Sequence, residues 1–260
     1  MDKRWAVVLG IAAMGSLAGC GLALAGPSVT PSASSASQIP TTRGPTSIGV
    51  TGFTKYERAA LRVRNVGCLS GSTGSGFAIS DHTVITGRHV ICGADLLKVT
   101  TVDGQDVEVT QVGAAVIADL AVVRTVQTLP ATVRLAKANP SVGTAVMAVG
   151  FPLGGPVTTS RGHVLGYRKD PAGWSSLPML LTDAPIDQGS SGSALLNEAG
   201  ELVGVVYALT GPGSGYAVPV EVLNGLLKDQ RSYSQPAPCG GAPATSSPSP
   251  STTPCSQTSP

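Results

Sequence analysis

Short apolar runs, separated by glycine, proline, aspartate and asparagine, make up the hydrophobic pattern in the middle of this chain. Valine-rich runs of this length, bounded by turn-forming residues, are typical of β-strands. We therefore predict an all-β protein. The clearest candidate strands are Leu61–Val66, Phe77–Ile79, Leu97–Val102, Val107–Val112, Ala145–Val149, Leu202–Ala208 and Tyr216–Val218.

One segment follows a helical period instead. Val220–Gln230 comes directly after Pro219 and carries aliphatic side chains at i, i+1, i+4 and i+5 spacing. This spacing places the side chains on one face of a helix. We therefore expect a helix over these residues.

The N-terminus has the form of a bacterial export signal. Two basic residues precede the apolar run Trp5–Leu17, and Leu17-Ala18-Gly19-Cys20 fits a lipoprotein processing site. The thiolate of Cys20 would take a diacylglycerol, and the chain would be held by lipid on the extracytoplasmic side of the bacterial cell membrane. Two alternatives stay open: an ordinary cleaved signal, and an uncleaved spanning helix, because the apolar run continues to about Gly26.

Both ends of the chain lack the strand pattern. Residues 27–48 and 235–260 are rich in proline, serine and threonine, which is typical of linkers and disordered tails. The middle of the chain, about 180 residues, can bury a substantial core. We divide the chain into a signal peptide (1–19), a lipidated cysteine with a linker (20–50), a folded domain (51–233) and a disordered tail (234–260).

Charge and cysteine content narrow the function classes. The net charge is +2 and only 12% of residues are charged, so nothing favours binding to nucleic acid. The chain has neither a Cys-x-x-Cys motif nor a cluster of cysteine and histidine, so we expect no metal and no cofactor. In an exported protein, Cys68, Cys92, Cys239 and Cys255 suggest disulfides, with three possible connectivities. Our candidates are Cys68 with Cys239 or Cys68 with Cys92.

Ser191 is the candidate nucleophile. It lies in the turn Gly-Ser-Ser-Gly-Ser-Ala, directly after a segment that resembles a strand. In such a turn the amides of Gly189 and Ser191 would point at one spot, where an oxyanion forms in acyl transfer. The turn alone is weak support, because turns rich in glycine and serine are common.

His89 and Asp119 supply the partners that this serine would need. Of the three histidines, His89 alone follows a buried-looking strand, Thr83–Thr86, at a strand end. Asp119 stands inside an apolar stretch, where a carboxylate is costly to bury unless it is paired. A structural histidine and a solvent-facing aspartate are the simpler alternatives. The chain order His-Asp-Ser is that of chymotrypsin-type folds, and Ser193 stands where the α/β-hydrolase motif needs glycine.

Together these motifs resemble the trypsin-like serine proteases, and most closely the HtrA branch and its bacterial relatives. The resemblance covers residues 52–230. The matching segments are Gly74–Phe77, Val84–Val90, Ala118–Val122, Gly150–Val164, Thr182–Gly192 and Gly215–Pro219.

The resemblance implies two six-stranded antiparallel β-barrels, about 51–135 and 141–219, and a C-terminal helix at 220–230. It implies a serine endopeptidase with a polypeptide substrate. Ser191 would be the nucleophile, His89 the general base and Asp119 the orienting carboxylate. The amides of Gly189 and Ser191 would form the oxyanion hole.

Departures from the family limit what carries over. Ser190 replaces the acidic or amide residue that usually precedes the nucleophile, so activation by an ion pair to a new N-terminus is not expected. We expect no PDZ domain in the low-complexity tail. Pro185 stands where trypsin has its acidic specificity residue, which favours a small or aliphatic residue before the scissile bond.

Two other functions fit the same residues. A catalytically silent surface lipoprotein would act as a binding or chaperone-like module, but binding alone needs no His/Asp/Ser set. An esterase or acyltransferase would use the same three side chains on another substrate. The oligomeric state does not follow from the sequence.

Overall fold

The computed structural model describes residues 53–67, 71–115, 117–211, 214–229, 233, 234 and 236, without the side chains of 208–211. The expected signal peptide, Cys20, the linker and the tail after residue 236 lie outside this part of the chain. So do Cys68, Cys239 and Cys255. Within the described ranges, no helix is both long enough and apolar enough to cross a membrane.

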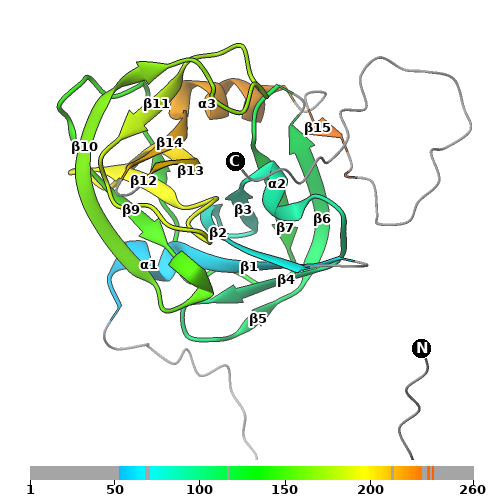
Figure 1. The fold of residues 1–260 in the computed structure, drawn as a ribbon. Helices are drawn as coiled ribbons and strands as arrows, with labels where there is room; N and C mark the ends of the chain where they lie inside the picture. Colours follow the sequence, from blue (N-terminus) through cyan, green and yellow to red (C-terminus); the bar gives the residue numbers. More distant parts are fainter. Residues whose placement is uncertain are drawn as a thin grey trace, which may run out of the picture. The chain divides into compact units, whose positions relative to one another are not determined.

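The first sheet is built almost entirely from the N-terminal half of the described chain. Its strands are antiparallel and follow the spatial order β15-β6-β7-β3-β2-β1-β4-β5. The sheet curls strongly, as Figure 1 shows. Its strands are β1 (Ala60–Gly67), β2 (Gly71–Ser80), β3 (Thr83–Thr86), β4 (Ala94–Thr101), β5 (Asp106–Val107), β6 (Val109–Ala115), β7 (Ala121–Thr125) and β15 (Tyr233–Ser234).

The second sheet closes on itself. Its order is β12-β9-β10-β11-β14-β13-β8, and a further pairing of β12 with β13 completes a six-stranded ring. The short β8 adds to β13 in parallel, outside the ring. Its strands are β8 (Arg134–Leu135), β9 (Ala145–Gly150), β10 (Thr158–Arg168), β11 (Met179–Thr182), β12 (Ala194–Asn197), β13 (Glu201–Gly211) and β14 (Ser214–Pro219).

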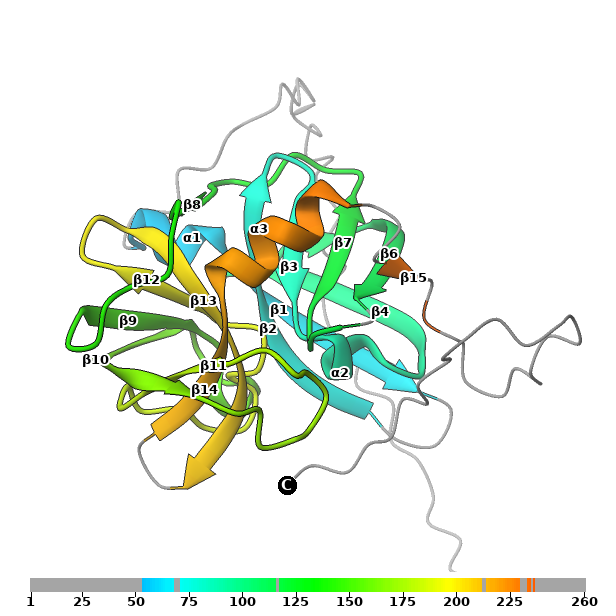
Figure 2. The same ribbon diagram turned by 90° about the horizontal axis from the view of Figure 1, so that it is seen from above.

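The helices are short. They are α1 (Lys55–Ala59), α2 (Arg88–Ile91), the 3-10 turn η1 (Pro152–Gly154) and α3 (Val220–Lys228). In α1, Thr54 and Glu57 form a capping box, which satisfies two amides at the helix start. In α3, Val220, Leu223 and Leu226 are buried, and the helix runs from β14 toward the first sheet (Figure 2). The predicted C-terminal helix is confirmed and ends at Lys228.

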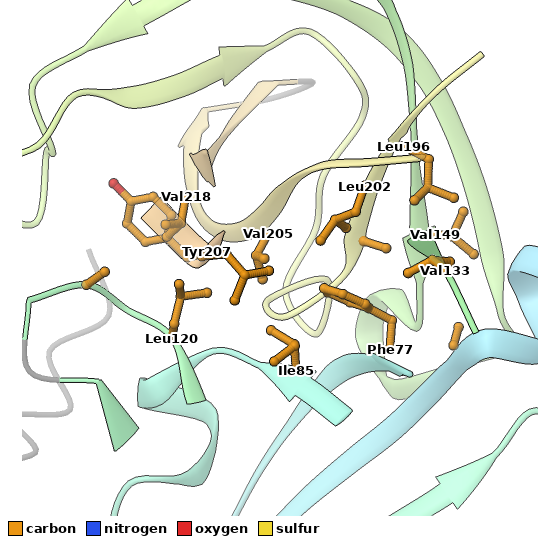
Figure 3. Close-up of a cluster of buried hydrophobic side chains, with 14 of the residues drawn as sticks. Phe77, Ile85, Leu120, Val133, Val149, Leu196, Leu202, Val205, Tyr207 and Val218 are labelled. Atoms are coloured by element: carbon orange, nitrogen blue, oxygen red, sulfur yellow. The ribbon is translucent and has the colours of Figure 1, made fainter. Parts of the chain in front are cut away.

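An apolar cluster joins the two sheets. Phe77, Ile85 and Leu120 come from the first sheet and its loops, whereas Val205 and Val218 come from the second (Figure 3). All five side chains are almost completely buried. Burial of a large apolar side chain stabilises the fold by about 1.5–3 kcal/mol. The cluster therefore stabilises the packing of the two sheets against each other.

The predicted fold class is confirmed, with one difference in detail. The second sheet is a closed six-stranded barrel, while the first is a curled half-barrel. In the first sheet, β5 covers the free edge of β4, and β15 covers the free edge of β6. Each of these short strands pairs with two residues of its neighbour, and β4 and β6 do not pair with each other.

Candidate active site

His89 is presented by the short helix α2, at the end of a completely buried strand. All four residues of β3 are buried, and the extended Gly87 turns the chain into α2. A side chain at Gly87 would place its Cβ 3.2 Å from Asp119 Oδ2 and 3.2 Å from the His89 ring. Glycine at this position therefore leaves room for the imidazole beside the carboxylate.

Asp119 lies just before β7 and is only 2% exposed. Its Oδ1 accepts the backbone N–H of His89 at 2.9 Å, and its Oδ2 lies 2.5 Å from His89 Nδ1. Both carboxylate oxygens are therefore engaged by the same residue. This pairing offsets the cost of burying the charge and orients the ring, so that Nε2 is left for other contacts.

The two effects on the pKa of His89 oppose each other. Burial lowers the pKa, because it disfavours the charged imidazolium. The negative charge of Asp119 and its hydrogen bond raise the pKa, and together they outweigh burial and the charge of Arg88. The pKa of His89 therefore lies above its ordinary value.

This raised pKa predicts the acid limb of any reaction that uses His89 as a base. The imidazole accepts a proton only when it is neutral, so kcat/KM should fall as the pH drops below its pKa. We expect the midpoint of this limb above the value of about 6.5 that is typical of a free imidazole. The rate of labelling by a fluorophosphonate, measured from pH 5 to pH 9, tests this. A midpoint at or below about 6.5 would contradict it.

Ser191 follows a tight turn at residues 187–190. Ser190 N donates to Asp187 O at 3.0 Å, and Gly189, the third residue of the turn, has φ of 85°. A positive φ at this position only is the mark of a type II turn, and it favours glycine. A Cβ on Gly189 would also lie 2.8 Å from the backbone oxygen of Phe151.

The amides around this turn differ in their hydrogen bonding. Within the described part of the chain, neither Gly189 N nor Ser191 N has a hydrogen-bond acceptor. The neighbouring amides of Ser190, Gly192 and Ser193 all have one. Gly189 N and Ser191 N, the predicted oxyanion donors, are therefore both left unengaged among the described residues.

The structure brings His89 and Asp119 into direct contact, but it does not join Ser191 to His89. Ser191 Oγ lies 3.4 Å from the carbonyl oxygen of Tyr207. Among the described residues, it makes no hydrogen bond to His89. Such contacts in unliganded enzymes are often long and tighten only with substrate. A rotation of Ser191 about its Cα–Cβ bond would redirect the hydroxyl.

A loop between β10 and β11 also reaches the site, although no sequence motif indicated it. The ring centroid of Trp174 lies 5.9 Å from that of His89 and 6.3 Å from that of Tyr207. Buried Asp170 anchors the loop, since it accepts hydrogen bonds from Tyr207 Oη and from the amides of Ala172 and Ser175. Apart from Trp5, Trp174 is the only tryptophan of the chain, and its place in a polar loop was the available signal.

Tyr207 keeps its proton at this contact. Burial raises the pKa of the phenol, and the hydrogen bond to Asp170 raises it further. The hydroxyl therefore donates to the carboxylate throughout the neutral range. Tyr207 links the loop of Trp174 to β13, whose backbone carbonyl at the same residue faces Ser191.

The structure also describes the residues considered for a disulfide, for specificity and for metal binding. Cys92 is buried at the C-terminal end of α2 and is disulfide-bonded, and its partner lies outside the described residues. The pairing therefore stays a prediction. Asn65 Nδ2 donates to the carbonyl oxygens of Val90 and Cys92, which braces the same end of α2.

Pro185, the residue considered for specificity, is exposed. Within the described ranges, no group of acidic, histidine or cysteine side chains could hold a metal ion.

Comparison with known families gives a match over residues 74–205, just over half of the chain, to the family described as "Trypsin-like peptidase domain". This range contains His89, Asp119 and Ser191.

Comparison with curated proteins finds bacterial serine endoproteases. A probable periplasmic serine endoprotease, DegP-like, of Hahella chejuensis is 33% identical over 158 residues, which are 58% of this chain and 34% of that protein. The serine endoprotease DegS of Haemophilus influenzae is 32% identical over 166 residues, which are 60% of this chain and 49% of that protein. The chain thus spans a third to a half of the length of these relatives.

Solved structures show the same fold. The Rv3671c protease of M. tuberculosis in its active form superposes with a TM-score of 0.61 at 22% identity, over 71% of this chain and 85% of that one. A serine endoprotease from Yersinia pestis gives a TM-score of 0.56 at 26% identity, over 68% of this chain and 66% of that one.

Proposed function

Because this chain belongs to the trypsin-like peptidase family, we propose that it is a serine endopeptidase that cleaves peptide bonds through an acyl-enzyme on Ser191. One observation carries the proposal. His89 and buried Asp119 form a hydrogen-bonded pair in the matched range, and the same range holds a serine turn whose Gly189 and Ser191 amides are unengaged among the described residues. Binding alone requires neither feature.

The proposed reaction has two halves. Ser191 Oγ attacks the substrate carbonyl carbon while His89 Nε2 takes the hydroxyl proton. The amides of Gly189 and Ser191 donate to the oxyanion. His89 then protonates the leaving amine, the C–N bond breaks, and the acyl group remains on Ser191. In the second half, His89 takes a proton from water as the water oxygen attacks the ester carbonyl carbon. The tetrahedral intermediate then breaks down, His89 returns the proton to Ser191 Oγ, and the acid is released.

Asp119 has two roles in this scheme. Its contact with Nδ1 selects the tautomer with an unprotonated Nε2, which is the nitrogen that must accept the serine proton. Its negative charge stabilises the imidazolium that forms. The same attraction raises the pKa of His89 before any substrate is bound.

The proposed enzyme does not use an ion pair to a new N-terminus for activation. Ser190 is buried beside the nucleophile, and its Oγ accepts from Asp187 N at 3.3 Å. An uncharged hydroxyl in a local contact offers no partner for an ammonium group. The oxyanion turn is therefore held by other contacts.

Export and anchoring belong to the same proposal. The DegP-like relatives described as periplasmic support export to the extracytoplasmic space. A disulfide at Cys92 fits an oxidising compartment. Lipidation of Cys20 would hold the protease domain at the membrane surface through a linker.

For specificity, we propose a small or aliphatic residue before the scissile bond. Pro185, six residues before Ser191, offers no carboxylate to a basic side chain. Asp183 lies close by, but its Oδ1 accepts from His163 N.

Covalent labelling tests the proposal. The full chain, incubated with a fluorophosphonate, should gain one adduct, and mass spectrometry of its peptides should place the adduct on Ser191. The same protein should cut an unfolded polypeptide such as reduced casein. Ester hydrolysis without cleavage of casein would favour an esterase. Absence of both in a folded protein would favour the silent binding module.

A further inference from the structure

We propose that Ser75 is a positioning residue that holds the oxyanion turn 187–190 in the geometry needed for catalysis. The inference rests on the proposed function, because it assigns Ser75 to the same reaction. Among the described residues, Ser75 makes no hydrogen bond to the His89 side chain or to Ser191 Oγ. It would act through the backbone of Gly189.

Ser75 links three segments at once. It lies in β2 and is completely buried. Its Oγ donates to Gly189 O at 2.8 Å and accepts from Phe151 N at 2.8 Å. Its own N–H donates to Ser191 O at 2.7 Å, and its carbonyl oxygen accepts from Thr86 Oγ1. One serine of the first sheet thus connects the turn to the loop after β9.

The turn at residues 187–190 needs a contact such as that of Ser75, because the hydrogen bond that closes the turn forms equally in a type I and in a type II turn. Type I and type II turns share the bond from Ser190 N to Asp187 O and differ in the direction of the central peptide. In the observed type II turn, Gly189 N is free to face an oxyanion. A flip of the peptide between Gln188 and Gly189 would direct Gln188 O toward that space instead.

Two bonds oppose the flip, one on each side of Gly189. Leu153 N donates to Gln188 O at 2.5 Å, and Ser75 Oγ donates to Gly189 O. Ser75 also sets up the first bond, because it holds Phe151 N, two residues before Leu153. The Ser75 hydroxyl therefore holds the peptide after Gly189 directly, and it supports the Leu153–Gln188 bond through Phe151.

The backbone conformation of Leu153 independently supports the view that the peptide between Gln188 and Gly189 is held in place. Leu153 is the only non-glycine residue with positive φ among the described residues, at 55°. Its side chain is 78% exposed, so packing of that side chain does not hold the conformation. Strained backbone of this kind persists only where its surroundings fix it, and it gathers at functional sites. Here the conformation directs the Leu153 amide at Gln188 O.

The test compares Ser75→Ala with Ser193→Ala in the full chain. Ser193 is a matched control: it is also a buried serine of the same region, and its Oγ has no hydrogen-bond partner among the described residues. For both variants, kcat and KM for a peptide substrate and affinity for a peptide boronic acid, whose oxygen occupies the oxyanion hole, are measured. Thermal melting shows whether each variant is folded.

We expect Ser75→Ala to lower kcat by about 10- to 100-fold, less than the loss of an oxyanion donor itself. KM should stay within about twofold, and boronate affinity should fall by the same factor as kcat, because both depend on the oxyanion hole. Ser193→Ala should stay within about twofold of the wild type in all three. If Ser75→Ala does not fold, Ser75→Gly, which also lacks the hydroxyl, replaces it with the same expectation.

A folded Ser75 variant with kcat and boronate affinity like those of Ser193→Ala would overturn this inference and leave the proposed function standing. A rise in KM with unchanged kcat would overturn it as well, because a substrate-binding role would explain that result. A wild type that neither accepts the fluorophosphonate at Ser191 nor binds the boronic acid would overturn the proposed function and this inference together.

Discussion

Alanine at Ser191 or at His89 is expected to lower kcat for peptide hydrolysis by about 10⁶-fold. Without Ser191 Oγ no acyl-enzyme forms, and without His89 nothing nearby takes the proton of that hydroxyl. The two decreases in kcat should not multiply in the double variant, because each substitution removes the same reaction step. The double variant should therefore be about as slow as either single one.

Steady-state hydrolysis at high enzyme concentration, with fluorophosphonate labelling in parallel, measures this effect. Ser191→Ala should accept no label. Ser193→Ala serves again as the control for loss of a nearby buried hydroxyl. If folded Ser191→Ala kept more than a small fraction of the wild-type rate, another nucleophile would be responsible, and the assignment of Ser191 would be wrong.

Asparagine at Asp119 is expected to lower kcat by about 10⁴-fold while leaving the fold intact. Asn has the shape of Asp, so the buried site stays filled. Its amide, however, has one acceptor oxygen, whereas Asp119 uses both oxygens on His89. With the oxygen on His89 N, the NH₂ group would face Nδ1. The ring would then carry its proton on Nε2 and could not accept one from Ser191.

The same substitution should change the titration of His89. Asp119 supplies both effects that raise the pKa, so the pKa of His89 should fall in the variant, because burial and Arg88 then act unopposed. Proton NMR of the imidazole measures this shift independently of turnover. Asp183→Asn is the matched control, since Asp183 lies beside His163 in a largely exposed pair. It should change kcat by less than about twofold. An unchanged pKa of His89 in Asp119→Asn would contradict the assigned role.

The fold class was predictable because strands and turns leave local signals. Valine-rich runs between turn residues marked most of the strands, and the spacing of Leu223 and Leu226 marked α3. The opening of the first sheet was not predictable. One edge of that sheet is β15, a strand of two residues that pairs with Ala114 and Ala115 far away in sequence. No local pattern distinguishes so short a strand from a loop.

Some residues of the candidate site could likewise be predicted from the sequence, and others could not. His89, Asp119 and Ser191 were predicted from motifs, each of which spans only a few residues. Trp174 and Asp170 were missed because a polar loop of common composition shows its role only when folding brings it against His89 and Tyr207. The contacts of Ser75 span 76 and 114 residues of sequence.

By itself, the sequence determined the chemical groups of this protein and their family pattern: a serine in a glycine-rich turn, a histidine at a strand end and an aspartate in an apolar stretch. It did so because side-chain chemistry and turn preference are local properties. Only the tertiary structure decided which of these groups meet. The engagement of both Asp119 oxygens, the direction of the Gly189 peptide and the contacts of Ser75 arise when the two sheets pack together, and that packing depends on residues far apart in the chain.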